Sequence, residues 1–209
     1  MTKSYYHLDT IPSDLMDIVE RDLSEQFGSD MVQSGLMGAQ TPNLDIRNSQ
    51  NAWVPTTHWV GGLIWHYFTR ANNEFFNYKL VGIDGESMQY TSYGLNQQYN
   101  WHIDEGIGSM YRPAASASNN RKDPVRIQDF LNEQGEQMRK LSVIVQLAHG
   151  DDYEGGSTEI KDLDGKVYTV PRERGTIVFF DSRLHHRACT VTKGLRKSLI
   201  AWAIGPRWR

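Results

Sequence analysis

Hydrophobic residues recur at helical spacing in two segments of the first 80 residues. Pro12 and Ser13 form a helix start signal, with Ser13 as the expected N-cap, and apolar positions then recur as far as Phe27, before Gly28. A second, longer helix is predicted from residue 57 to about residue 79, because one apolar face carries Val60, Leu63, Ile64, Tyr67, Phe68, Ala71 and Phe75. We interpret both apolar faces as core surfaces that pack against a sheet. Residues 28–55 are rich in Gly, Pro, Asn and Ser, which predicts irregular structure with at most one short strand.

From about residue 81 the pattern changes to short β-rich runs separated by turn signals. The runs are SMQYTSYG, QYNWHID, KLSVIVQLA, KVYTVPR, GTIVFFD, HHRACTVT and RKSLIAWAIG. Many short strands at close spacing are typical of a sandwich or jelly roll. The predicted fold class is therefore mainly β with N-terminal α-helices, in which helices back one face of a jelly-roll core.

Residues 105–140 interrupt this pattern. They contain SMYRPAASASNNRKDP, which is poor in apolar residues, followed by a short helical stretch near RIQDFLNEQ. We expect an insertion that acts as a lid, because long insertions in compact domains are often functional. No internal repeat or domain boundary is visible. The prediction is one domain over residues 1–209, with helical support in 1–80 and a jelly-roll core in 81–209.

Composition narrows the class of protein. The 209 residues are 39% hydrophobic, which excludes disorder of the whole chain, and the net charge is -3, so no basic surplus indicates nucleic acid as a partner. Cys189, the single cysteine, cannot form an internal disulfide. The polar N-terminus lacks the apolar core of a signal peptide, and no apolar run is long enough to span a membrane. We expect a cytoplasmic protein without a membrane partner.

The segment QYNWHIDEG carries the clearest candidate chemistry. His102 and Asp104 are two residues apart, so in a strand both side chains point to the same face. A metal site needs a third ligand, and the adjacent His185 and His186 follow the apolar run TIVFF on a late strand. Two histidines and one carboxylate are the ligands of non-haem Fe(II) oxygenases. The alternative is that these are ordinary polar residues of a strand.

A second candidate site lies further along the chain. Arg196 and Ser198 would share one strand face, and together they offer donors suited to a carboxylate. A buried arginine without an acidic partner is costly, so either the protein or a ligand must supply the carboxylate. Taken alone, Arg196 could equally be a surface residue of the strand.

Together these segments resemble the Fe(II)- and 2-oxoglutarate-dependent dioxygenases of the prolyl 4-hydroxylase type, in particular small bacterial and phage-like members. The resemblance covers roughly residues 88–206 and rests on YGLNQQYNWHID, KLSVIVQL, DDYEGG, GTIVFF and HRACTVTKGLRKSLIAW. Many animal and plant prolyl hydroxylases have lysine at the position of Arg196, so the chain resembles the arginine-bearing branches. The insertion 105–140 has no counterpart in this comparison.

The resemblance implies a role for individual residues. The metal ligands fall on His102, Asp104 and His186, and His186 is preferred to His185 because the basic residue of the family lies ten positions after the last ligand, at Arg196. The cosubstrate-binding residues fall on Arg196, Tyr93, Ser198 and Tyr99. The implied cofactors are Fe(II), 2-oxoglutarate, O2 and ascorbate as a reductant.

The implied reaction is hydroxylation of an unactivated C–H bond, with release of succinate and CO2. Asp104 favours hydroxylation over halogenation, because halogenating relatives carry a small residue at that position. The expected substrate is a prolyl or other peptidyl residue of a peptide or protein, and a free amino acid or other small molecule is the alternative. A non-catalytic jelly-roll module that binds the metal or a ligand is a further alternative. A structural zinc site fits less well, because such sites close with four protein ligands and favour thiolates.

Overall fold

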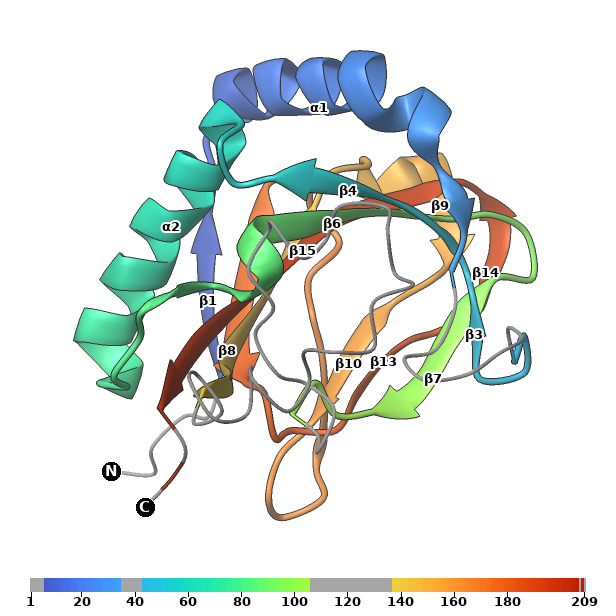
Figure 1. Ribbon diagram of the computed structural model, residues 1–209. Helices are drawn as coiled ribbons and strands as arrows, with labels where there is room; N and C mark the ends of the chain where they lie inside the picture. The colour runs from blue at the N-terminus through green and yellow to red at the C-terminus, as the bar shows by residue number, and fades with distance from the viewer. Residues whose placement is uncertain (1–5, 35–42, 106–136, 207, 209) are drawn as a thin grey trace, which may run out of the picture.

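The computed structural model describes residues 6–34, 43–105, 137–206 and 208 and contains two α-helices and two main sheets (Figure 1). The helices are α1 (Ser13–Phe27) and α2 (Trp59–Ala71). The eight-stranded sheet has the order β1 (Tyr6–Thr10), β12 (Thr176–Asp181), β8 (Gln137–Gln146), β15 (Arg196–Pro206), β6 (Ser87–Tyr93), β4 (Gln50–Pro55) and β2 (Val32–Gln33), with β5 (Gly82–Ile83) paired to β15. The five-stranded sheet has the order β11 (Val167–Thr169), β10 (Thr158–Lys161), β13 (His186–Ala188), β7 (Gln98–His102) and β3 (Arg47–Asn48), and β14 (Val191–Gly194) pairs with β9 (Tyr153–Gly155).

Both helices cover one face of the eight-stranded sheet (Figure 1). Phe68 of α2 meets Phe179 of β12 with ring centroids 5.6 Å apart, and both side chains are fully buried. Leu23 of α1 belongs to the same apolar cluster. Burying a side chain of this size contributes about 1.5–3 kcal/mol, so both helices stabilise the sheet that they cover.

The other face of the eight-stranded sheet packs against the five-stranded sheet. Ile144, Val178 and Phe180 of the larger sheet form a second apolar cluster with Ile160 of β10. The molecule therefore has three layers, which are the helices, the large sheet and the small sheet. This arrangement confirms the coarse prediction of a mainly β fold with helices on one side.

The start of α1 differs from the prediction. Ser13 is the first helical residue, and Pro12 occupies the cap position without a capping side-chain hydrogen bond. Proline suits this place because its fixed φ and missing N–H cost nothing at the start of a helix. The helix ends at Phe27 as predicted, but Gly28 has right-handed dihedral angles and begins a short 3-10 turn, Gly28–Asp30.

The second helix is shorter than predicted. Regular α-helix stops at Ala71, one π-helical turn follows over Asn72–Phe76, and Asn77 adopts the left-handed conformation with φ 55°. The side chain of Asn72 explains this end, because it bonds both the backbone N–H and the backbone carbonyl of Tyr78. The apolar pattern continues to Phe75, which is exposed, so the pattern alone overestimated the length of the helix.

The expectation of at most one short strand in residues 28–55 was wrong, because β2, β3 and β4 lie there, and β1 precedes them. β1 pairs with β12 and β4 pairs with β6, so both extend the large sheet, and β3 joins the small sheet. β4 was missed because it is short and ends at Pro55, although Ala52 and Val54 are buried. The predicted run HHRACTVT divides into two strands, β13 and β14.

The strand that follows the proposed insertion 105–140 begins earlier than expected. β8 already begins at Gln137, which pairs with Pro206 of β15. The expected lid and the short helix near RIQDFLNEQ fall on residues 106–136, outside the described residues. Within the described chain, neither helix has both the length and the apolar character needed to cross a bilayer.

Candidate metal centre and anion pocket

Three potential metal ligands converge between the two sheets. One ligand atom each from His102, Asp104 and His186 lie within 4.8 Å of one another. His102 Nε2 lies 3.9 Å from Asp104 Oδ1, and His186 Nε2 lies 3.4 Å from Asp104 Oδ2. The Asp104 and His186 side chains are only 7% and 5% exposed. The spacing of His102 and Asp104, and the resemblance that selects His186, predict this group. In the structure the three side chains lie close together.

Strand pairing brings the two histidines together. His102 at the end of β7 is directly opposite His186 on β13, and their ring centroids are 4.1 Å apart. Between this pair and the pair Ala188 and Tyr99 the register shifts by one residue, which is a β-bulge. Because of the bulge, Tyr99 points to the same side as His102, and the two rings stack with centroids 3.5 Å apart.

A backbone carbonyl orients each imidazole. Nδ1 of His102 lies 2.7 Å from the carbonyl oxygen of Asn100, and Nδ1 of His186 lies 3.1 Å from that of Leu184. A carbonyl can only accept, so Nδ1 carries the proton in both rings. Nε2 therefore keeps its lone pair and faces the centre, as in many metal-ligating histidines.

The position of Asp104 has a different cause from the one expected. β7 ends at His102, so Asp104 does not share a strand face with it. Instead, the backbone N–H groups of Asp104 and Glu105 both donate to the carbonyl oxygen of Ser182, at 3.0 and 2.9 Å. The hydroxyl of Ser142 on β8 donates to Asp104 Oδ2 at 2.7 Å. The turn after β12 and the large sheet thus fix the carboxylate.

The protonation states of the ligands suit a metal. Burial and the nearby His186 lower the pKa of His102 to about 3. Burial alone would raise the pKa of Asp104, but His186, His102, Arg139 and the Ser142 hydrogen bond together lower that pKa. At neutral pH the His102 ring is neutral and Asp104 is ionised, which are the forms that ligate metals. The donor set of two imidazoles and one carboxylate fits Fe(II).

The two adjacent histidines have different environments. His186 is 4% exposed, whereas His185 is exposed and its backbone carbonyl accepts the N–H of Lys161 on β10. Their side chains point to opposite faces of the small sheet because they are consecutive in an extended chain. Only His186 joins His102 and Asp104.

Arg196 lies at the start of β15 and is 2% exposed. One terminal nitrogen donates to Thr158 Oγ1 at 2.8 Å and to Gln146 Oε1 at 3.4 Å. No carboxylate of the described residues lies within ion-pairing distance of its guanidinium. The alternative of a surface arginine is therefore wrong.

Several buried polar atoms near Arg196 have no hydrogen-bond partner among the described residues. They are Arg196 Nε, Ser198 Oγ and Thr91 Oγ1. Ser198 is directly opposite Thr91 across the pair β15–β6, and Arg196 is opposite Tyr93. A buried guanidinium beside unpaired hydroxyl groups matches the donors that a carboxylate needs. We call Arg196, Ser198, Thr91 and Thr158 the anion pocket.

The two predicted tyrosines belong to the same hydrophobic cluster, but different charged groups lie against their rings. The Arg196 guanidinium carbon is 5.3 Å from the centroid of the buried Tyr93 ring, which borders the anion pocket. Tyr99 stacks on His102, and the guanidinium carbon of Arg47 lies 4.7 Å from its ring centroid. Arg47, Ser142, Ser182, Gln146 and Thr158 were missed because contacts between distant strands leave no local sequence signal.

Residues 88–204 match the 2OG-Fe(II) oxygenase superfamily, over more than half of the chain. The chain belongs to this superfamily. It is 28% identical over 117 residues to a PKHD-type hydroxylase of Caulobacter vibrioides, an alignment that covers 56% of this chain and 42% of the relative. The chain thus matches less than half the length of this curated relative.

Solved structures share the fold. A prolyl-4-hydroxylase of Pseudomonas putida superposes with a TM-score of 0.66 at 17% identity, covering 95% of this chain and 92% of the other. A prolyl hydroxylase of Trichoplax adhaerens, in complex with a peptide fragment of the hypoxia inducible factor oxygen degradation domain, gives a TM-score of 0.69 at 16% identity, covering 97% and 84%. At these identities the likeness concerns the fold.

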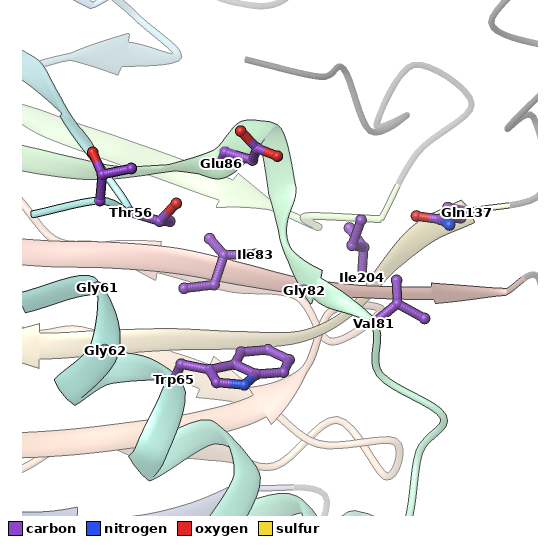
Figure 2. Close-up of a pocket in the computed structure, with 11 residues that line it drawn as sticks. Thr56, Gly61, Gly62, Trp65, Val81, Gly82, Ile83, Glu86, Gln137 and Ile204 are labelled. Atoms are coloured by element: carbon purple, nitrogen blue, oxygen red, sulfur yellow. The ribbon is translucent and has the colours of Figure 1, made fainter. Parts of the chain in front are cut away.

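A separate cavity of about 740 Å³ opens beside the first turns of α2 (Figure 2). Trp65 of α2, Ile83 of β5 and Ile204 of β15 line it. No predicted metal ligand or cosubstrate-binding residue is among the lining residues. The candidate chemistry is therefore in the space between the sheets and not in this cavity.

Proposed function

We propose that this chain is an Fe(II)- and 2-oxoglutarate-dependent dioxygenase that hydroxylates an unactivated C–H bond. The observation that carries the proposal is the convergence of His102, Asp104 and His186 in a member of the 2OG-Fe(II) oxygenase superfamily. When bound, Fe(II) would supply the oxidising chemistry, using 2-oxoglutarate and O2 and releasing succinate and CO2.

Each side chain has a definite task in this proposal. Nε2 of His102, Nε2 of His186 and the Asp104 carboxylate hold the metal. Arg196 would bind the far carboxylate of 2-oxoglutarate, and Ser198 would add a hydroxyl donor. The buried position of Arg196 supports this task, because a ligand carboxylate would supply its missing counter-charge.

We further infer the architecture and the supporting groups. The two facing sheets form a double-stranded β-helix, and residues 1–209 form one domain in which α1 and α2 support the larger sheet. Tyr93 borders the cosubstrate, and Tyr99 supports His102 from the side. Ascorbate would serve as an external reductant, and no residue is assigned to it.

For the substrate we propose a prolyl or other peptidyl residue. The support is the similarity in fold to prolyl hydroxylases, one of which was solved with a peptide fragment. A screen of peptides for a mass gain of one oxygen tests this class, with free amino acids as the competing class. Turnover of a free amino acid and of no peptide would contradict the peptidyl assignment.

The proposal is tested by adding Fe(II) and then 2-oxoglutarate to the metal-free protein without oxygen. We expect a visible charge-transfer absorption band, and on admission of O2 slow formation of succinate. His102→Ala and Asp104→Ala should abolish both signals, since removing a ligand should exceed the roughly 100-fold loss typical of outer-shell changes.

The adjacent histidine provides a matched control. His185→Ala should retain the band, whereas His186→Ala should lose it, because only His186 faces the centre. The opposite result would mean that the wrong histidine was assigned. A wild-type protein that binds Fe(II) and 2-oxoglutarate yet forms no succinate would support the non-catalytic binding module instead.

A further inference from the structure

The turn between β12 and β13, residues 181–184, contacts two of the three proposed metal ligands. The Ser182 carbonyl oxygen accepts the backbone N–H of Asp104 at 3.0 Å, and the Leu184 carbonyl oxygen lies 3.1 Å from His186 Nδ1. One short segment therefore sets both the backbone position of the carboxylate ligand and the ring orientation of a histidine ligand.

Two buried serines extend this contact to the carboxylate itself. The Ser182 and Ser142 hydroxyl oxygens are 2.9 Å apart, and Ser142 Oγ lies 2.7 Å from Asp104 Oδ2. Both serines are completely buried. A ligating carboxylate is ionised and can only accept, so Ser142 donates its single proton to Asp104. Ser142 can then only accept from Ser182, which fixes the direction of the chain from Ser182 through Ser142 to Asp104.

The turn is anchored independently of the ligands. The Asp181 carboxylate accepts the Tyr78 hydroxyl at 2.5 Å and Nε of Arg183 at 2.8 Å. The backbone N–H of Ser182 donates to the carbonyl oxygen of Lys140 at 3.1 Å. The Arg183 guanidinium carbon lies 4.0 Å from the ring centroid of Trp208, whose indole N–H donates to Glu105 at 2.7 Å. Glu105, the residue after Asp104, is thus tied to the same turn.

The sequence position of Ser142 points to the same role. Ser142 lies within the apolar run of β8, directly opposite Phe180 of β12. A buried hydroxyl in an apolar environment is costly unless it is paired, and the partners of Ser142 are Asp104 and Ser182. An alanine would pack there without that cost if no bond to Asp104 were needed.

We propose that Ser142 and Ser182 are positioning residues that hold the Asp104 carboxylate in its metal-binding orientation, with Ser182 acting through Ser142. This inference rests on the proposed metal site and adds residues outside the ligand set. Outer-shell partners of this kind typically contribute 10–100-fold to metal affinity.

The test measures Mn(II) binding to the metal-free protein by the loss of the free-ion electron paramagnetic resonance signal. Ser142→Ala should raise the dissociation constant by about 10-fold or more, and Ser182→Ala by a smaller factor. The double variant should bind no more weakly than Ser142→Ala alone, because Ser182 acts through Ser142. Losses that multiply in the double variant would overturn the proposed direction of the chain.

Ser92→Ala is the matched control. Ser92 is a buried serine of β6 whose hydroxyl contacts the sulfur of Met31, so its removal also deletes a buried hydroxyl from the large sheet. It should bind Mn(II) like wild type. Unfolding midpoints of the metal-free proteins show whether each variant is folded, and if Ser142→Ala is not, the comparison of Ser182→Ala with Ser92→Ala decides.

The outcomes separate this inference from the proposed function. If the wild-type protein binds no Mn(II), the proposed metal site itself is wrong. Wild-type binding together with unchanged binding by folded Ser142→Ala would overturn the positioning role and leave the proposed function intact. Affinity for 2-oxoglutarate at saturating Mn(II) should stay within about twofold of wild type in Ser182→Ala, because the anion pocket does not contact these serines.

Discussion

The metal centre and the anion pocket differ in how completely their buried polar atoms are paired. At the metal centre both Nδ1 atoms have a carbonyl partner, and Asp104 is held by Ser142 and by the Ser182 carbonyl. In the anion pocket Arg196 Nε, Ser198 Oγ and Thr91 Oγ1 have no hydrogen-bond partner within the part of the chain that the structure describes. The polar atoms of the metal centre are thus paired within the protein, whereas those of the anion pocket include unpaired donors.

This difference indicates which of the two sites is ready for its ligand in the folded protein alone. Paired atoms around a ligand set hold it ready before the metal arrives, which lowers the ordering cost of binding. Unpaired buried donors raise the free energy of the ligand-free protein until an anion satisfies them. In the proposed function the metal centre is therefore preorganised, whereas the anion pocket carries a free-energy cost that binding of 2-oxoglutarate would remove.

Replacing Arg196 with methionine should have the largest effect on this comparison. Arg196→Met keeps the length of the side chain but removes its charge, so affinity for 2-oxoglutarate should fall by about 2–5 kcal/mol. The ligand-free variant should be at least as stable as wild type, because a buried charge without a counter-charge is lost. Isothermal titration with 2-oxoglutarate and urea unfolding measure the two quantities.

Mn(II) binding is the internal control for Arg196→Met, because Arg196 contacts none of the three ligands. It should stay within about twofold of wild type. If ligand-free Arg196→Met is less stable than wild type, Arg196 already has its counter-charge within the protein. The contrast between the metal centre and the anion pocket would then disappear.

Two threonines of the anion pocket test the same idea with a smaller effect. Thr158 Oγ1 accepts a bond from Arg196, whereas Thr91 Oγ1 has no partner, and both side chains are buried. Thr158→Val should lower the free energy of unfolding of the ligand-free protein by about 1–3 kcal/mol, since it leaves a charged donor underpaired. Thr91→Val should leave that free energy unchanged or raise it. Equal losses in urea unfolding would show that Thr91 is paired in solution.

The sequence predicted those parts of the site that depend on local spacing. His102 and Asp104 are close in sequence, and the interval from His186 on β13 through β14 to Arg196 on β15 is short, so pattern and resemblance together indicated them. Ser142 and Ser182 could not be predicted in this way. Their role depends on which strands become neighbours, and a serine in an apolar run does not reveal its partner.

The fold shows the same limit. The long apolar patterns of α1 and α2 identified both helices, but the side chain of Asn72 ended the second one through a bond to Tyr78, six residues further on. β1 and β4 were missed because each is short and acquires its stability from a partner strand far along the chain, β12 and β6 respectively. Long periodic segments were therefore predictable, and short paired ones were not.

Substitutions of Tyr99 have the smallest expected effect on binding. They show whether Tyr99 supports the metal centre or the anion pocket. The resemblance placed it with the cosubstrate, whereas the structure stacks its ring on His102 and places the Arg47 guanidinium carbon 4.7 Å from the ring centroid. Tyr99→Phe keeps the ring, so Mn(II) affinity should stay within about twofold, while Tyr99→Leu should lose the stacking contribution of about 0.5–1.5 kcal/mol. Titration with 2-oxoglutarate at saturating Mn(II) completes the test. If Tyr99→Phe weakens 2-oxoglutarate binding and leaves Mn(II) binding intact, the Tyr99 hydroxyl contributes to cosubstrate binding. Tyr99 then belongs to the anion pocket and not to the metal centre.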